Sequence, residues 1–283
     1  MTKRQPNRRS AMIFSALQPE CFDEGINVGP DIVVFDLEDG TVPERKAEAR
    51  ASIDAVFERD APFLKYLRVN HPHTMDGLRD LVALLDWQTP PDGLLLPKIE
   101  AVEEIRQITQ TVCKAHPNIE LMPIIETARG LERVHEIANA APEVVMLLLG
   151  SDDLSASVGS DRNWDALAYA RGRVVAAAAD AGIEAMDGAF YDPEDQGGLL
   201  DELTRVASMG FSGKASYHAG QIPHIHSAFT PSRDAVAEAK RILETAAMDA
   251  VGNTRLDGKM VNAAIVKRAR RLLAIAERRG EVG

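Results

Sequence analysis

The sequence of 283 residues has few cysteines, no long apolar run and no excess of positive charge. Cys21 and Cys113 are its two cysteines, and they stand far apart, which excludes a disulfide framework and a zinc site built on clustered cysteines and is typical of a reducing compartment. The basic stretch from Met1 to Arg9 is not followed by an apolar segment, unlike a secretory signal. No apolar run is long enough to span a membrane. We therefore expect a soluble, cytoplasmic protein with no membrane partner.

The charge balance narrows the range of partners. Acidic residues outnumber basic ones by 43 to 32, which gives a net charge of -11. This excess of negative charge argues against nucleic acid or an anionic membrane as the main partner. It leaves room for a small anionic substrate, because a site can be locally positive on an acidic protein. The proportions of hydrophobic and charged residues, 45% and 27%, are those of an ordinary globular enzyme.

Short apolar runs alternate with longer amphipathic stretches, and the alternation repeats eight times. Runs that are almost continuously apolar are typical of parallel strands covered on both faces. The stretches between them carry apolar residues at helical spacing, as in Ala101–His116. The predicted strands are Ser10–Phe14, Ile32–Phe35, Tyr66–Val69, Gly93–Leu96, Leu121–Ile125, Val145–Leu149, Gly182–Ala185 and Gly213–Ala215.

Eight βα units in series, without the glycine motif of a dinucleotide-binding fold, predict a (β/α)₈ TIM barrel in the α/β class. The strand pattern stops after Phe229. We expect a helix from Pro231 to about Ala250 and a final helix from about Lys259 to Arg279. The predicted organisation is a catalytic barrel over residues 1–229 and a C-terminal helical extension, or lid, of the same domain over residues 230–283.

Polar residues follow most of the predicted strands, at the end of the barrel where active sites lie. Several carboxylates that converge with an arginine are what Mg²⁺ and a carboxylate substrate need, because magnesium takes hard oxygen ligands and only one or two protein carboxylates. Each residue taken alone is explained as well by helix capping or solvent contact; the whole ring favours a site. These strand-end residues are Asp36, Glu38, Asp39, Arg68, Asn70, Lys98, Glu100, Glu126, Ser151, Asp152, Asp153, Asp187, Lys214 and Ser216.

Several motifs occur in a fixed order along nearly the whole chain. Together they resemble the family of citrate lyase β-subunits, malyl-CoA lyases and related metal-dependent 2-oxo-acid aldolases. Each motif alone is weak, whereas their number and order make the resemblance specific. The motifs are VFDLEDG (34–40), LRVN (67–70), LLPK (95–98), PIIETARG (123–130), LGSDDLSASVG (149–159), MDG (186–188) and FTPS (229–232).

The resemblance implies a Mg²⁺ site, in which Mn²⁺ could replace Mg²⁺. Its ligands would be Glu126 and Asp153. Asp152 is the adjacent alternative, but the family pattern places the ligand directly before Leu154. The implied activity is that of a carbon–carbon lyase, which cleaves its substrate by a retro-Claisen or retro-aldol reaction.

The resemblance also assigns roles to residues around the metal. Arg68 would bind the substrate oxygen or carboxylate and stabilise an enolate, because its planar fork matches a carboxylate and stays charged. Asp36, with Glu38, would accept hydrogen bonds from metal-bound water. Asp187 would lie at the rim of the same site. Gly130 would free the backbone at a helix start, where amide groups meet a substrate carboxylate.

Three segments depart from the family pattern, and all concern the thioester side of the site. The stretch Gly258–Ala264 carries Asn262 where acyl-CoA lyases have an aspartate that a lid offers to a neighbouring subunit. An amide cannot act as a base, so Asn262 is interpreted either as a substrate contact or as a helix N-cap. The first βα loop, Ser15–Pro19, lacks a Pro-Gly turn and leads into acidic residues. Ser216–Ala219 replaces a tryptophan and a His-Pro pair.

These departures leave three functions open. The first is a lyase for a β-hydroxyacyl-CoA, such as a malyl- or citramalyl-type thioester, or for the corresponding hydroxy acid. The second is a class II pyruvate aldolase that does not use CoA, and the third is a catalytically degraded paralogue that only binds ligands. By resemblance we expect a homo-oligomer, a trimer or a hexamer. His71 and His73 follow Arg68 and are interpreted either as bases or as part of a solvated loop.

Overall fold

The computed structural model describes residues 6–247 and 255–279. The unit Arg8–Ile225 contains a closed barrel of eight parallel strands in sequence order, in which β8 pairs with β1. The predicted (β/α)₈ barrel is therefore confirmed. The strands are β1 Ser10–Ser15, β2 Ile32–Asp36, β3 Leu64–Arg68, β4 Gly93–Leu96, β5 Glu120–Ile125, β6 Met146–Leu149, β7 Glu184–Asp187 and β8 Gly213–Ser216.

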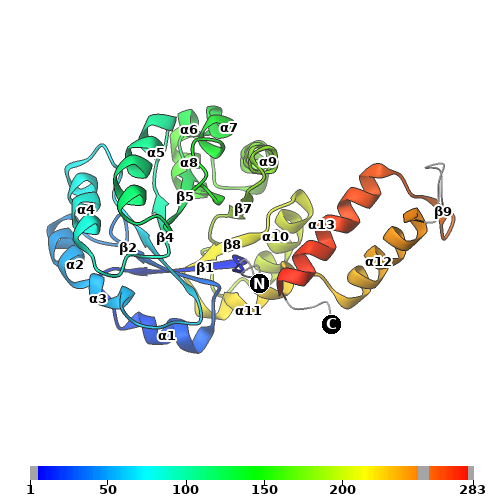
Figure 1. Ribbon diagram of the computed structural model, residues 1–283, viewed down its shortest axis with the longest axis horizontal. Helices are drawn as coiled ribbons and strands as arrows, with labels where there is room; N and C mark the ends of the chain where they lie inside the picture. Colours follow the sequence, from blue (N-terminus) through cyan, green and yellow to red (C-terminus); the bar gives the residue numbers. More distant parts are fainter. Residues whose placement is uncertain (1–5, 248–254, 280–283) are drawn as a thin grey trace. The chain divides into compact units, whose positions relative to one another are not determined.

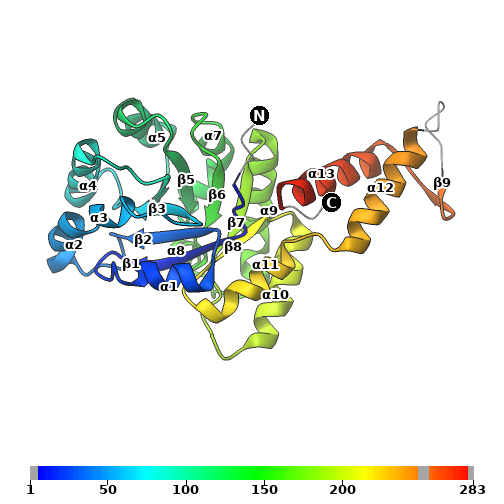
Figure 2. The ribbon, with the colours of Figure 1, turned by 60° about the horizontal axis from the view of Figure 1, so that its bottom comes forward.

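Every strand is followed by at least one helix, and the helices lie outside the ring of strands (Figures 1 and 2). Side chains of Thr74, Asn163 and Asp195 cap the helices that follow them by accepting backbone N–H groups. The helices are α1 Cys21–Val28, α2 Lys46–Ser52, α3 Asp54–Phe57, α4 Met75–Asp86, α5 Val102–Ile108, α6 Ala128–Glu132, α7 Val134–Ala138, α8 Ser151–Val158, α9 Trp164–Ala181, α10 Gln196–Met209 and α11 Ile222–Ala228.

All eight predicted strands overlap observed ones, and no predicted boundary is wrong by more than two residues, as at the start of β7. The expected strand began at Gly182, whereas β7 begins at Glu184. Gly182 has a φ of 71° and ends α9 in the left-handed conformation, which glycine adopts without steric cost. The helix expected over Ala101–His116 is also present, but its second half, Thr109–Cys113, is a π-helix.

The barrel interior is filled by side chains from alternate positions of the strands. Ile32 and Val34 of β2 belong to this buried cluster, as does Tyr66 of β3. The hydroxyl of Tyr66 donates to Glu120, which also pairs with Arg8. These partners satisfy the hydrogen-bonding capacity of the buried tyrosine hydroxyl at the amino end of the strands. The carboxyl end of the barrel remains available for a site.

Strand register decides which strand-end residues become neighbours. In the β2–β3 pair, Asp36 is the partner of Arg68. In the β7–β8 pair, Asp187 is the partner of Lys214. The register of the parallel strands therefore places each of these acidic residues beside a cation.

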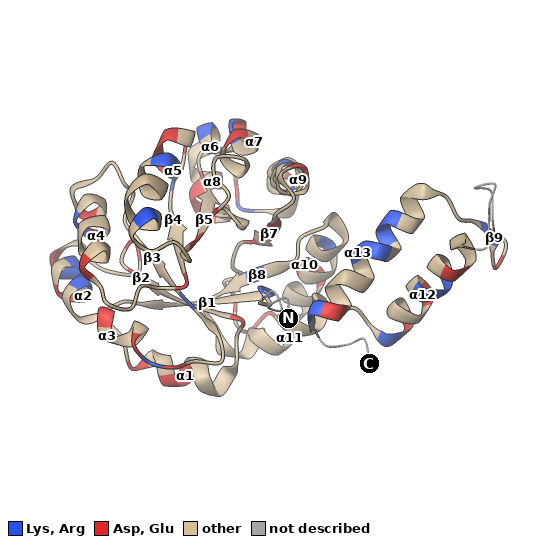
Figure 3. Cartoon of the chain, in the orientation of Figure 1, with Lys and Arg blue, Asp and Glu red and all other residues tan. Residues whose placement is uncertain are grey.

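The residues from His226 onward belong to a second compact unit, which divides from the barrel unit inside α11. Its main helices are α12, Arg233–Ala247, and α13, Ala263–Arg279, which pack against each other. Exposed basic residues gather along one stretch of α13, from Lys267 to Arg271 (Figure 3). The proposed boundary at residue 229 and the lid role of residues 230–283 stay predictions.

The start of the final helix was predicted wrongly. Instead of a helix from Lys259, the chain forms a short antiparallel hairpin of β9, Arg255–Leu256, and β10, Lys259–Met260. Asp257 and Gly258 both have positive φ, 47° and 78°, as a two-residue hairpin turn requires. The earlier helix was expected to reach Ala250, and its last residues lie outside the described part of the chain. None of the described helices has the length and hydropathy needed to span a membrane.

Gly93 tests how tightly the barrel interior is packed. A Cβ at this position would lie 2.4 Å from the Tyr66 ring, so Gly93→Ala should destabilise the protein by about 1–3 kcal/mol through overpacking. Urea denaturation measures the effect. The matched control is Gly172→Ala in α9, where a Cβ meets no atom within 4 Å and a gain of about 0.5–1 kcal/mol is expected. Equal effects of the two substitutions would contradict this packing.

Candidate active site

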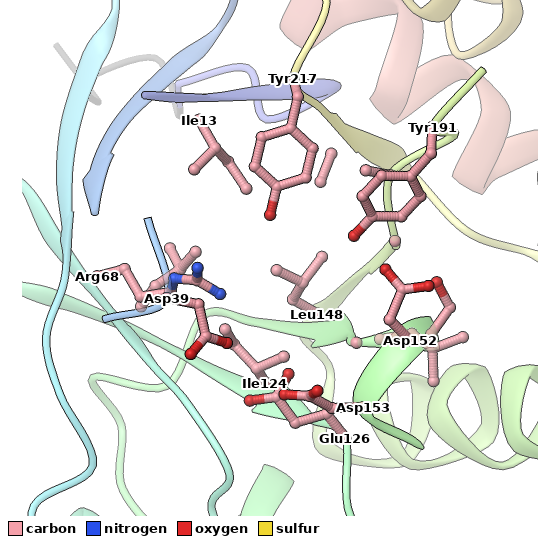
Figure 4. A pocket seen from close by; sticks show the side chains of 17 residues that line it. Ile13, Asp39, Arg68, Ile124, Glu126, Leu148, Asp152, Asp153, Tyr191 and Tyr217 are labelled. Atoms are coloured by element: carbon pink, nitrogen blue, oxygen red, sulfur yellow. The ribbon is translucent and has the colours of Figure 1, made fainter. Parts of the chain in front are cut away.

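A pocket of about 280 Å³ lies at the carboxyl ends of the strands. Its walls combine apolar residues of the barrel interior with acidic residues, one arginine and two tyrosines (Figure 4). Catalytic residues of (β/α)₈ barrels are found at this end. The lining residues are Ile13, Asp39, Arg68, Leu95, Ile124, Glu126, Leu148, Leu149, Gly150, Ser151, Asp152, Asp153, Gly188, Ala189, Tyr191, Ala215 and Tyr217.

Arg68 reaches the pocket from the end of β3 and is held there by Asp36. Its Nε donates to Asp36 Oδ1 at 2.6 Å, and Nη2 donates to Oδ2. The same carboxylate accepts the backbone N–H groups of Glu38 and Gly40. The attraction of Asp36 outweighs the desolvation of Arg68 and raises the arginine pKa well above its ordinary value. Asp36 is not among the lining residues, and its contacts are those of a positioning residue for Arg68.

Glu126 follows β5 and is almost fully buried, with 5% of its surface exposed. Its Oε1 accepts the backbone N–H of Lys98 at 2.8 Å. Gly150 leaves the necessary space, since a Cβ there would lie 2.4 Å from Oε2 of Glu126. Burial, followed by the negative charge of Glu38, raises the pKa of Glu126 to about 7. The pocket therefore holds more negative charge than its cations offset.

Lys98 follows β4 in a left-handed backbone conformation, with a φ of 54°. Such a conformation costs a non-glycine residue about 1–3 kcal/mol and is concentrated at functional sites. Its ammonium group contacts Glu38 and lies 3.1 Å from Asp153 and 3.5 Å from Asp39. Lys98 thus donates its main-chain N–H to one acidic residue and offers its side chain to three others.

Asp152 and Asp153 begin α8 but take different partners. Asp153 is partly exposed and lies beside Glu126 in the pocket (Figure 4). Asp152 pairs with Arg162 at 3.1 Å, on the side of the pocket where Tyr191 lies (Figure 4). The structure therefore brings together the two carboxylates that were predicted as metal ligands. Both offer the hard oxygen atoms that a divalent cation such as Mg²⁺ prefers.

Asp187 does not reach the pocket, contrary to its expected place at the rim. It is completely buried, with Oδ1 bonded to Arg171 at 2.9 Å and Oδ2 bonded to Lys214 at 2.6 Å. These two cations outweigh the desolvation of the carboxyl and lower its pKa. The following residues, Gly188 and Ala189, line the pocket instead. Asp187 anchors the end of β7, because the strand register places it beside Lys214.

Gly130 and Asn262 are engaged in local structure. The N–H of Gly130 donates to Thr127 Oγ1 at 2.9 Å, and a Cβ would lie 2.5 Å from the carbonyl oxygen of Ile99. Close packing therefore explains this glycine, which is not a lining residue. Asn262 belongs to the second unit, where its Oδ1 accepts the N–H of Ile265 at 3.0 Å. This is the N-cap geometry that was one of its two interpretations.

Tyr191 and Tyr217 form a wall opposite Glu126 and Asp153, with their hydroxyl groups pointing into the cavity (Figure 4). Their ring centroids are 5.6 Å apart, and the guanidinium of Arg162 stacks on Tyr191 at 4.3 Å. Burial raises the pKa of both hydroxyls. The sequence analysis missed this pair as site residues. Tyr217 could have been found, because it directly follows β8, whereas Tyr191 lies four residues beyond β7.

A closed barrel with such a pocket, in which an arginine faces two carboxylates, has the arrangement of a barrel enzyme for small acids. Comparison with known proteins identifies the family. The chain belongs to the HpcH/HpaI aldolase/citrate lyase family, whose model matches residues 9–219. Membership of this family confirms the predicted class of enzyme, a carbon–carbon lyase.

Individual relatives cover nearly the whole chain. The citrate lyase subunit beta of Escherichia coli (strain K12) is 28% identical over 96% of this chain and 94% of its own length. The L-malyl-CoA/beta-methylmalyl-CoA lyase of Rhodobacter capsulatus is 31% identical, with 92% of each chain covered. Among solved structures, protein CitE from Mycobacterium tuberculosis in complex with magnesium, acetoacetate and coenzyme A is 29% identical. It aligns with a TM-score of 0.79 over 97% of this chain and 99% of that chain.

The raised pKa of Glu126 predicts a pH-dependent effect of Glu126→Gln on the protein without metal. The folded-state pKa of about 7 lies above the unfolded value of 4.5. The folded protein therefore loses stability as the pH rises from the unfolded pKa toward the folded one. The glutamine cannot ionise, and the variant should be more stable than the original protein at pH 8, by on the order of 3 kcal/mol. The advantage should shrink toward zero near pH 4.

Urea denaturation in EDTA at several pH values measures this difference. The exposed substitution Glu103→Gln in α5 serves as the control. A stability difference for Glu126→Gln that does not change between pH 4 and pH 8 would show that the buried carboxyl ionises normally.

Proposed function

We propose that this protein is a Mg²⁺-dependent lyase that cleaves a β-hydroxyacyl-CoA of the malyl or citramalyl type, or the corresponding free hydroxy acid. The observation that carries the proposal is the pairing of Glu126 with Asp153 in one small pocket that Arg68 also lines. The relatives named as citrate lyase and malyl-CoA lyase support the same chemistry. A homo-oligomer, a trimer or a hexamer, is part of this proposal by resemblance to the family.

Glu126 and Asp153 would hold the metal. Magnesium prefers one or two protein carboxylates and completes its shell with water and substrate; Mn²⁺ has a similar preference for oxygen ligands. The cation would offset the charge that raises the pKa of Glu126. When bound, it would act as a Lewis acid that polarises the oxygen atoms of the substrate. The CitE protein of Mycobacterium tuberculosis has been solved with magnesium and oxaloacetate.

Arg68 would bind the substrate oxygen on which negative charge develops as the carbon–carbon bond breaks. Its fork is already oriented by Asp36, so little reorganisation is needed during the reaction, and such preorganised charge is a large contribution to catalysis. The rings of Tyr191 and Tyr217 would exclude water from the opposite side of the substrate. The ammonium group of Lys98 would offset the negative charge of Glu38 and Asp153 beside the metal.

The size of the pocket supports a small acid as the reacting fragment. Its volume of about 280 Å³ lies just below the roughly 300–1,000 Å³ that is typical for drug-sized ligands. The hydroxy-acid part of a thioester fits this space, and the CoA part would extend outside it. In the related CitE complex, acetoacetate and coenzyme A are present together.

One observation favours a second candidate, a class II pyruvate aldolase that does not use CoA. Asn262 stands where the related acyl-CoA lyases have a carboxylate, and its side chain caps α13. The substrate pocket does not depend on this residue, so a reaction confined to the small acid would be unaffected by the replacement.

Variants of the proposed metal ligands should lose metal binding, whereas a variant of Arg68 should lose catalysis and keep metal binding. Asp153→Asn and Glu126→Gln should each weaken Mg²⁺ binding at least about tenfold, because each removes a charged ligand. Arg68→Lys should leave Mg²⁺ affinity nearly unchanged but lower kcat/KM by roughly a hundredfold, because lysine lacks the planar fork.

Calorimetry and a malyl-CoA cleavage assay measure the two effects. Circular dichroism of each variant controls for loss of folding. Unchanged Mg²⁺ affinity in both carboxylate variants would exclude them as ligands, and a fully active Arg68→Lys variant would exclude Arg68 from substrate binding.

The role of Asn262 can be tested by restoring a carboxylate. Asn262→Asp should keep the helix cap, since aspartate caps as well as asparagine, and should raise thioester cleavage by about 10²–10⁴-fold if the missing step is proton transfer. The control is Asn262→Ser, which also caps but offers no carboxylate. Efficient thioester cleavage by the unaltered protein would show that another base acts. No gain, together with no binding of CoA, would favour the CoA-independent aldolase or a protein that only binds its ligand.

A further inference from the structure

A group of three potential metal ligands lies outside the pocket. His71 and His73 belong to the loop between β3 and α4, and Glu104 lies in the first turn of α5. One ligand atom from each residue lies within 4.8 Å of the other two. Among the described residues, 6–247 and 255–279, no other group of three or more histidine, cysteine and acidic side chains meets this spacing.

We propose that these three residues form a second metal site, which binds a divalent first-row transition metal such as zinc. Two imidazoles and one carboxylate are the ligands of many zinc and non-haem iron sites that keep a position open for water or substrate. Magnesium, by contrast, prefers oxygen ligands. The two sites should therefore differ in the metal they select.

Glu104 is a buried carboxylate with one oxygen already in use. Its Oε2 accepts the backbone N–H groups of Glu100 and Ala101, at 2.8 Å and 3.1 Å, and this arrangement fixes the side chain at the start of α5. The other oxygen, Oε1, faces both histidine rings. Capping α5 therefore does not require Oε1, which is free to bind a metal.

The distances around Oε1 suit a shared ion better than direct hydrogen bonds. The oxygen lies 3.6 Å from Nε2 of His71 and 3.5 Å from Nδ1 of His73, beyond the range of a good N–H···O bond. Two ligand atoms that each lie about 2.0–2.1 Å from a tetrahedral zinc ion are roughly 3.3 Å apart. Small rotations of the rings would complete such a geometry.

The loop that carries the histidines is held in place before any metal binds. The carbonyl oxygen of His71 accepts hydrogen bonds from the N–H and the hydroxyl of Thr74. Gly77 packs so closely that a Cβ there would lie 2.0 Å from the same oxygen. The side chain of His73 is 61% exposed, so solvent metal can reach the group and water can complete the coordination.

His71 Nδ1 accepts the backbone N–H of His73 at 3.2 Å, which leaves the ring proton on Nε2. Metal uptake through Nε2 would move this proton to Nδ1, at the expense of the long hydrogen bond, so that the ligand stays a neutral imidazole. The bound ion would join the loop after β3 to the start of α5. These segments lead directly from the strands that carry Arg68 and Lys98, so the site would brace one side of the pocket.

The experiment uses the full-length protein, stripped with a chelator and then supplied with excess Mg²⁺. Zn²⁺ is titrated by calorimetry and Co²⁺ by visible absorption, in the unaltered protein and in a Glu126→Gln, Asp153→Asn double variant. We expect one equivalent of Zn²⁺ or Co²⁺ to bind in both proteins. The double variant keeps this result independent of whether the acidic pocket binds Mg²⁺ as proposed above.

In the double variant, His71→Ala, His73→Ala and Glu104→Gln should each weaken Zn²⁺ binding at least about tenfold. The matched control, His224→Ala, should leave it unchanged, because His224 bonds Gln196 far from the group in sequence. His73 is exposed, so its replacement tests the site without a risk of unfolding. No Zn²⁺ equivalent in the double variant, or an affinity that none of the three substitutions alters, would overturn the proposal.

Discussion

The excess of buried negative charge at the carboxyl end of the barrel is the constraint on which the site depends. Parallel strands end at one level, so the acidic residues that follow them converge. Asp36 is offset by Arg68 and Glu38 by Lys98, but among the described residues no salt bridge reaches Glu126. Desolvation of an ionised carboxyl is costly in such surroundings. The high pKa of Glu126 is the direct consequence, and a divalent cation is the natural counter-charge.

Strand register explains why two similar aspartates end in different environments. Asp36 and Asp187 both close an apolar strand, and each lies opposite a cation on the next strand. Asp36 orients an arginine that lines the pocket and whose third nitrogen, Nη1, lies 3.3 Å from Glu38. Asp187 is enclosed because Arg171 from α9 also binds it. The difference arises from a side chain of α9, the helix that precedes β7, so the strand motif alone could not reveal it.

The sequence predicted the barrel well because strands buried on both faces are continuous apolar runs. Its errors lie where single residues adopt the left-handed conformation. Gly182 ends a helix rather than beginning a strand, and the Asp257-Gly258 turn folds the first residues of the expected final helix into a hairpin. For the site, charged residues directly after strands, such as Glu126 and Arg68, could be found. Tyr191 could not, because its place in the wall depends on the path of a loop.

Lys98 contacts both carboxylates that were predicted as metal ligands, one through its backbone and one through its side chain. Its left-handed backbone directs the N–H toward Glu126 and the side chain toward Asp153. A right-handed or extended residue would separate these two directions. The ammonium contacts Asp153 and Glu38 rather than Glu126, so it offsets the charge of Glu126 less directly. The backbone strain at Lys98 therefore maintains the charge imbalance that favours metal binding, and the free energy of folding of the barrel offsets its cost.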